Sequence, residues 1–125
     1  MSITQAQGPL AGRRILIVED ELLLALELQM LLEGAAYAVI GPVATVARAL
    51  DVLSTQRPDA VTLDVNLGGE NSAAVAGALV ELSVPFIVIT GYRRHPMQPE
   101  FGAAPLMNKP LDMTGLLAKL AGFFE

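Results

Sequence analysis

Three acidic residues stand at the ends of two short apolar runs, and they are the first candidates for chemistry. Glu19 and Asp20 directly follow the run 13–18, and Asp64 ends the run 59–63. An isolated carboxylate is costly to bury unless it is paired or bound to a metal ion. Three carboxylates that meet would repel one another, and Mg²⁺, which accepts carboxylate, water and phosphate oxygens, would remove that repulsion. Their positions therefore favour a magnesium site.

A hydroxyl group and an ammonium group follow two later apolar runs in the same way. Thr90 ends the run 86–90, and Lys109 follows the run 105–108. Lys109 would supply a mobile positive charge and Thr90 a hydroxyl donor. Together with a metal ion they suit the oxygens of a phosphoryl group, whose transfer needs mainly positioning and charge neutralisation. Because an Asp carboxylate can accept such a group covalently, Asp64 is the candidate nucleophile.

Each of these residues also has a purely structural interpretation. Glu19 and Asp20 could stabilise the start of a helix, where negative charge is favourable. Asp64 could begin a turn, Thr90 could be a strand-end hydroxyl, and Lys109 could be an exposed loop residue. Taken together, the five residues favour the phosphoryl site.

The elements around these residues should bring them to one edge of a sheet. We predict strands over 13–18, 37–43, 59–65, 86–90 and 105–108, and helices over 20–36, 45–56, about 72–82 and 112–124. This alternation with short connections predicts a parallel sheet with helices on both faces. Ligands of such sheets bind beyond the carboxyl ends of the strands, where all five candidate residues lie.

The composition agrees with a sheet that is covered on both sides. Of the 125 residues, 53% are hydrophobic, yet no apolar run approaches the roughly 20 residues of a membrane-spanning helix. Buried parallel strands explain such an excess. The chain has no cysteine, which excludes disulfides and thiolate metal sites, and no signal peptide is apparent, so we expect a cytoplasmic protein without membrane contact. Its net charge of −5 disfavours nucleic-acid binding.

The ordered motifs resemble those of response-regulator receiver domains of two-component signalling. "VEDE", "LDVNLGG", "ITG" and "NKP" follow the first, third, fourth and fifth predicted strands in turn. The resemblance covers residues 13–124 and implies a doubly wound, flavodoxin-like α/β fold with five parallel strands in the order 2-1-3-4-5. We therefore expect a receiver domain over 13–125, preceded by a flexible tail over 1–12.

The same resemblance implies roles for individual residues. It makes Asp64 the phosphoacceptor and makes Glu19, Asp20 and Asp64 the Mg²⁺ ligands, together with the backbone carbonyl of Asn66. Thr90 would be the switch hydroxyl. Lys109 would be the phosphate-binding lysine, followed by a cis bond to the next residue, a proline.

The sequence departs from most receivers in the parts that usually switch. Leu106 stands where many receivers carry an aromatic switch residue. Two prolines and a glycine between residues 92 and 104 predict that the fourth helix is short or absent. Thr90, Gly91 and Tyr92 match a receiver subgroup with a Phe-Ala-Thr-Gly…Tyr signature, although the Phe-Ala pair is missing. We hypothesise that switching is an order–disorder change over 91–104, in which Tyr92 moves and screens the phosphorylated Asp64 from water.

The first predicted helix is apolar nearly all round. Seven leucines between positions 22 and 32 do not fall on one stripe. A helix of this kind is normally buried or covered by a partner. Two interpretations stay open: an apolar surface on a monomer, or a docking surface for a helix of a phosphodonor histidine domain.

Together these features predict a stand-alone receiver that takes a phosphoryl group from a phosphohistidine and signals through protein contacts. The donor would be a histidine kinase or a histidine phosphotransfer protein, and a homodimer is an open option. The only catalysis expected is of its own phosphorylation and dephosphorylation. One alternative is a binding module that works without phosphorylation, although the acceptor and the lysine are both present. The other is a haloacid-dehalogenase-like phosphatase, which needs a second acid where this chain has Asn66.

Overall fold

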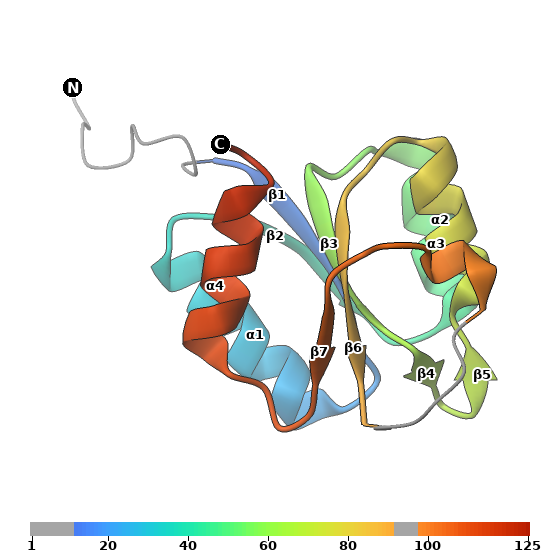
Figure 1. Ribbon diagram of the computed structural model, residues 1–125, viewed down its shortest axis with the longest axis horizontal. Coiled ribbons are helices and arrows are strands. Elements are labelled where there is room, and N and C mark those ends of the chain that lie inside the picture. The colour runs from blue at the N-terminus through green and yellow to red at the C-terminus, as the bar shows by residue number, and fades with distance from the viewer. Residues whose placement is uncertain (1–11, 92–97) are drawn as a thin grey trace.

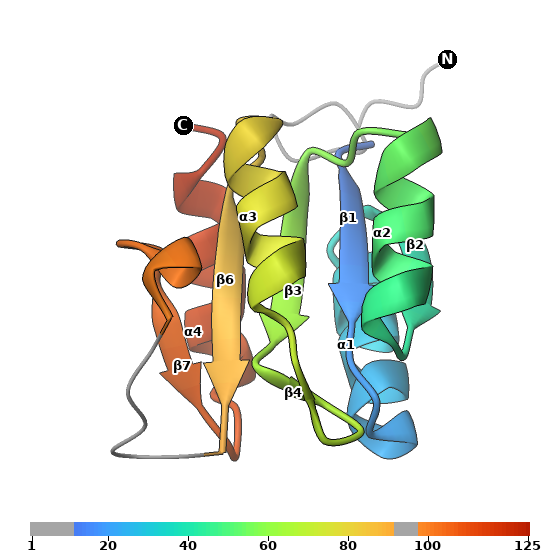
Figure 2. The same ribbon diagram turned by 90° about the vertical axis from the view of Figure 1, so that its right-hand side faces the viewer.

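The computed structural model of the chain describes residues 12–91 and 98–125, and a five-stranded parallel sheet forms its centre (Figure 2). Its strands are β1 (Arg14–Val18), β2 (Ala38–Val43), β3 (Ala60–Asp64), β6 (Phe86–Thr90) and β7 (Leu106–Asn108). They lie in the order β2-β1-β3-β6-β7. Numbered among themselves, these strands have the order 2-1-3-4-5, so the predicted topology is confirmed.

Helices cover both faces of this sheet. They are α1 (Leu22–Gly34), α2 (Val46–Thr55), α3 (Ala73–Glu81) and α4 (Met113–Gly122). The helices α1 and α4 pack on one face, and α2 and α3 pack on the other (Figure 1). The residues of β3 and β6 are buried throughout, as are all but the first of β1. Coverage on both sides therefore accounts for the high hydrophobic content.

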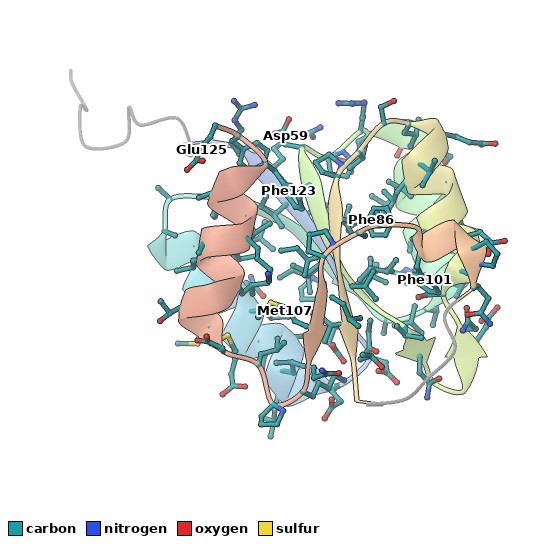
Figure 3. The ribbon with its side chains drawn as sticks, in the orientation of Figure 1. Asp59, Phe86, Phe101, Met107, Phe123 and Glu125 are labelled. Carbon is teal, nitrogen blue, oxygen red and sulfur yellow. The ribbon has the colours of Figure 1, made fainter. Side chains whose placement is uncertain are left out.

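Two apolar cores fill the spaces between the sheet and the helices (Figure 3). Successive strand side chains point to opposite faces. Accordingly Leu16 and Val18 of β1 enter the core under α2 and α3, whereas Ile15 and Ile17 enter the core under α1 and α4. The next residue in this alternation, Glu19, falls on the α1 and α4 face.

The edge strand β2 contains a register shift that helps to position the site. Pairing with β1 shifts between Leu16 and Val18, opposite Gly41 and Pro42. Gly41 has φ of 84°, and a Cβ atom there would lie 2.8 Å from the Val43 nitrogen. Pro42 lacks an N–H and is tolerated at a sheet edge or a bulge. Beyond the shift, the Val43 carbonyl accepts a hydrogen bond of 2.9 Å from the Glu19 N–H.

The connection between β6 and β7 lacks a regular helix in its described residues, 98–105. It contains η2 (Pro99–Phe101), a short 3-10 helix whose Phe101 side chain is buried in the core beside α3. The prolines predicted this shortening, because proline removes a helix hydrogen bond and clashes with the preceding turn.

A second, antiparallel pair of strands lies between β3 and α3. It consists of β4 (Asn66–Leu67) and β5 (Glu70–Asn71), joined by a turn of two glycines. Gly68 and Gly69 both have positive φ, 61° and 92°, which is the conformation that favours glycine in a two-residue hairpin turn. The sequence-based strands did not include this pair.

Two further predictions concern the N-terminal tail and membrane-spanning helices. The predicted tail over 1–12 lies outside the described residues except for Gly12. In the described part, no helix has the length and apolar character needed to cross a membrane.

Candidate functional site at the carboxyl end of the sheet

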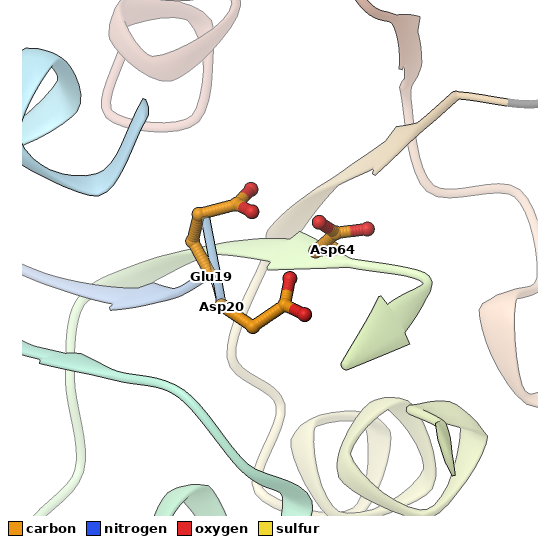
Figure 4. Close-up of side chains that lie close together, drawn as sticks. All are labelled: Glu19, Asp20 and Asp64. Carbon is orange, nitrogen blue, oxygen red and sulfur yellow. The ribbon is translucent and has the colours of Figure 1, made fainter. Parts of the chain in front are cut away.

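The predicted acidic residues meet at the carboxyl ends of β1 and β3 (Figure 4). These strands are parallel neighbours, and Val18 pairs with Leu63. The next residues along each strand, Glu19 and Asp64, therefore come side by side. Glu19, Asp20 and Asp64 each present one carboxylate oxygen within 4.8 Å of the others. Glu19 and Asp64 are buried, and Asp20 is exposed.

Backbone N–H groups orient each carboxylate of this cluster. Glu21 donates its N–H to Glu19 Oε2 at 3.0 Å, and Gly68 donates to Asp20 Oδ2 at 2.8 Å. Asn66 donates to Asp64 Oδ1 at 3.1 Å. Asp20 therefore contacts the β4–β5 turn, which argues against its alternative role as a simple helix cap.

The surroundings of Glu19 oppose a negative charge. Burial raises the pKa of Glu19 to about 8, and a hydrogen bond with the neighbouring Asp64 carboxyl adds to the rise. The Glu21 N–H and the positive charge of Lys109 act in the opposite direction but do not outweigh burial. Two adjacent carboxyl groups in a buried position thus favour keeping one proton.

Lys109 reaches this cluster from the segment after β7. Its Nζ atom lies 2.6 Å from Glu21 Oε1, 2.8 Å from Asp64 Oδ2 and 3.5 Å from Glu19 Oε2. Partial burial lowers the pKa of Lys109, but hydrogen bonds to Asp64 and Glu21 outweigh it, so the pKa is raised overall. Lys109 is therefore a stable cation beside Asp64, and not the isolated loop residue of the structural alternative.

Thr90 lies at the end of β6, next to the strand that carries Asp64. It is 1% exposed, and its carbonyl accepts a hydrogen bond of 2.9 Å from the Lys109 N–H. In the sheet register Thr90 pairs with Asn108, which precedes Lys109. The peptide bond after Lys109 is cis, as the family resemblance implied.

Sequence reasoning missed two residues that contact the site. Ser72, at the start of α3, donates its hydroxyl to the Asp64 carbonyl at 2.6 Å in a buried position. Its side chain makes no helix-cap hydrogen bond. Asn71 makes one at the start of α3, accepting from the Ala73 N–H at 2.8 Å. Glu21 is the other missed residue, and only its place in the "VEDE" motif hinted at it.

The remaining predicted residues lie around this centre. Asn66 comes two residues after Asp64, and its side-chain oxygen accepts a hydrogen bond from Gly69 at 2.9 Å within the β4–β5 turn. Leu106 begins β7 and is 47% exposed. Tyr92 lies outside the described residues, so its role in switching stays a prediction.

The donor set fits a hard divalent cation. All three ligand candidates are carboxylates, the kind of ligand that Mg²⁺ takes together with water and phosphate oxygens. Glu19 Oε1 is buried and has no hydrogen-bond partner among residues 12–91 and 98–125. Because buried polar atoms are normally paired, this oxygen indicates a site completed by an additional group.

A comparison with protein families decides the class of the chain. The model of the response regulator receiver domain matches residues 15–121. The chain belongs to this family. The acidic cluster lies at the residues of the "VEDE" and "LDVNLGG" motifs, as the sequence predicted. The family match favours a receiver domain over a haloacid-dehalogenase-like phosphatase.

Individual relatives agree with this assignment. The solution structure of SdrG from Sphingomonas melonis Fr1 is 39% identical and has a TM-score of 0.78, and the match covers 95% of this chain and 100% of the SdrG chain. Phyllosphere-induced regulator PhyR of Methylorubrum extorquens is 40% identical over 81 residues, which are 62% of this chain and 30% of PhyR. Sensory transduction protein LytT of Bacillus cereus is 34% identical over 103 residues, 79% of this chain and 42% of LytT. The chain thus spans less than half the length of these two curated relatives.

Proposed function

We propose that this receiver domain accepts a phosphoryl group on Asp64 from a phosphohistidine, with Mg²⁺ bound by Glu19, Asp20 and Asp64. The donor would be a histidine kinase or a histidine phosphotransfer protein. The observation that carries the proposal is the contact of buried Asp64 with Lys109, 2.8 Å apart, inside a cluster of carboxylates. The backbone carbonyl of Asn66 would be a further metal ligand. The protein would act in the cytoplasm.

Each residue of the site would have its own role in phosphoryl transfer. An oxygen of Asp64 forms a bond to phosphorus while the phosphorus–nitrogen bond of the donor breaks, and the imidazole leaves with that electron pair. Ser72 and the Asn66 N–H hold Asp64 in place through its carbonyl and Oδ1. Lys109 would offset the charge on the phosphoryl oxygens, and Thr90 would serve as the switch hydroxyl. Bound Mg²⁺ would supply further charge neutralisation.

Hydrolysis of the phosphorylated Asp64 reverses this state. Water attacks the phosphorus, inorganic phosphate leaves, and the Asp64 carboxylate is restored. The domain would therefore catalyse only its own phosphorylation and dephosphorylation and would not be an enzyme toward other molecules. Its signal would pass through protein contacts that differ between the two states.

The exposed face of α1 is the proposed docking surface for the donor. Leu22, Leu23 and Met30 are more than 70% exposed, and Leu26 is 45% exposed. A groove of about 630 Å³ lies beside this face, lined among others by Leu23, Glu21 and Lys109. A donor helix seated on the α1 face would thus lie close to Asp64, which favours docking over an unused apolar surface.

The direct test is the mass of the protein after incubation with acetyl phosphate and Mg²⁺. Wild-type protein should gain one phosphoryl group. Asp64→Asn, which keeps the side-chain shape but removes the nucleophile, should gain none. Asp51→Asn removes an exposed carboxylate on α2 and should behave as wild type. Stoichiometric phosphorylation of Asp64→Asn would refute the assignment, and an unmodified wild type would favour the phosphorylation-independent binding module.

A further inference from the structure

Glu21 is an acidic residue at the site to which the proposed function gives no role. Its Oε1 atom lies 2.6 Å from Lys109 Nζ, nearer than the oxygen of Asp64 at 2.8 Å. Its side chain is 62% exposed. It is not one of the three carboxylates that cluster within 4.8 Å, so it is separate from the candidate metal ligands.

The ammonium group of Lys109 is fully engaged in this arrangement. An ammonium group has three N–H donors. In the described part of the chain, Lys109 Nζ contacts three carboxylates, those of Glu21, Asp64 and Glu19. A phosphoryl group on Asp64 would bring new anionic oxygens that must compete for the same donors. Of these three partners only Glu21 is exposed, so water can solvate its carboxylate when Lys109 releases it, whereas Glu19 and Asp64 are buried.

The backbone of Glu21 is anchored independently of its side chain. Its N–H donates to Glu19 Oε2 at 3.0 Å, and its carbonyl accepts from Ala25 N–H at 2.9 Å in the first turn of α1. The side chain can therefore release Lys109 without movement of the helix.

We infer that Glu21 is a positioning residue that holds Lys109 in the unphosphorylated receiver and competes with the phosphoryl oxygens for its ammonium group. This inference rests on the proposed function. An ion pair with one exposed partner changes an equilibrium constant by a factor of about two to five. Removing the Glu21 charge should therefore favour the phosphorylated state by about that factor.

The experiment compares Glu21→Gln with a matched variant, Glu27→Gln. Glu27 is exposed and lines the same groove, but it is not among the carboxylates that contact Lys109. Binding of beryllofluoride, a stand-in for the phosphoryl group, is measured by calorimetry with saturating Mg²⁺. Glu21→Gln should bind about two to five times more tightly than wild type. Glu27→Gln should stay close to wild type, because it removes equal charge without freeing the lysine.

A second measurement tests the contact between Glu21 and Lys109 directly, in metal-free protein. The chain has two lysines, Lys109 and Lys119. In ¹⁵N-labelled protein the side-chain nitrogen signal of Lys109 should shift in Glu21→Gln, whereas that of Lys119, in the last turn of α4, should not. Shifts in both signals would indicate a general structural change and would overturn the inference.

The outcomes separate this inference from the proposed function. Equal or weaker beryllofluoride binding by Glu21→Gln, or the same gain in Glu27→Gln, would overturn the role of Glu21 and leave Asp64 as the acceptor. Failure of the wild-type protein to bind beryllofluoride would overturn the proposed function, and the inference with it.

Discussion

Glu19 is buried beside Asp64, and its surroundings favour the protonated carboxyl group. Burial raises the pKa of Glu19 from its ordinary value of 4.5 to about 8. Between these values the folded, metal-free protein keeps a proton that the unfolded chain has released. The stability from this group is therefore fully present below about pH 4.5 and is lost as the pH rises through 8.

Metal binding at this site should depend on pH for the same reason. A carboxyl group must lose its proton to bind a cation, so Mg²⁺ has to displace the proton on Glu19. We expect the apparent Mg²⁺ affinity to increase between pH 6 and 8, by at most about tenfold per unit, and to level off above 8. Calorimetric titration at a series of pH values measures this slope.

The control for this prediction is Glu19→Gln, which cannot release a proton. This variant should bind Mg²⁺ more weakly than wild type, and its affinity should not change between pH 6 and 8. A wild-type affinity that stays constant over this range would contradict the protonation of Glu19.

At the scale of the elements, the shift in β2 connects an edge strand to the site. Because the strand slips by a residue at Gly41, the Val43 carbonyl reaches the Glu19 N–H at 2.9 Å. The edge of the sheet thus fixes the backbone of a residue whose side chain lies in the acidic cluster.

Gly41→Ala should destabilise the fold markedly. Its φ of 84° is strained for any side chain, and the added Cβ would lie 2.8 Å from Val43 N and 3.2 Å from Ile17 O, both backbone atoms. We expect a loss of about 1–3 kcal/mol in the free energy of unfolding, measured by urea denaturation. Gly122→Ala is the control, since nothing lies within 4 Å of its Cβ position in α4 and alanine favours a helix. Equal stability of the two variants would be inconsistent with a strained turn at Gly41.

The connection from β6 to β7 is the element proposed to switch. Its described part is anchored by Phe101, which is 2% exposed, whereas Gln98 and Glu100 beside it are exposed. Segments with few buried contacts open at low free-energy cost. Beryllofluoride should therefore change amide hydrogen exchange mainly within residues 91–104, of which 92–97 lie outside the described part. Unchanged exchange there, with a response on another face, would reject this switch.

At the scale of the whole molecule, the two faces of the sheet differ in what they leave exposed. On one face, α1 exposes Leu22, Leu23, Leu26 and Met30, and Leu23 lines the groove that Lys109 also lines. On the other face, α3 exposes Val80. Burial of a leucine side chain by a partner stabilises the complex by about 1.5–3 kcal/mol when burial is complete. The exposed apolar area of α1 therefore supports the proposal that the donor docks there.

Leu23→Asn should slow phosphorylation by a phosphorylated histidine phosphotransfer protein but not by acetyl phosphate. Leu23 is 77% exposed, so the change removes apolar contact area without opening the core. We expect a decrease of about fivefold or more in the rate of transfer from the protein donor. Val80→Asn, on α3, should leave both rates unchanged. A parallel loss with acetyl phosphate would point to damage at the site instead of lost docking.

The sequence by itself determined the order of the elements and the residues at their ends. The apolar runs of β1, β3 and β6 are continuous because these strands are buried on both faces. A parallel sheet brings all carboxyl ends to one edge, so Asp64, Thr90 and Lys109 could be assigned to one site before the fold was known.

Only the tertiary structure decided which groups pair within that site. Asp20 with Gly68, Glu21 with Lys109 and Ser72 with the Asp64 carbonyl are contacts across loops, separated by 48, 88 and 8 residues along the chain. The shift at Gly41 was likewise absent from the predicted elements. Hydrophobic periodicity records which face of an element is buried, because burial acts on whole strands and helices. A hydrogen bond between two loops depends on how both loops are placed, and no local pattern in either one encodes its partner.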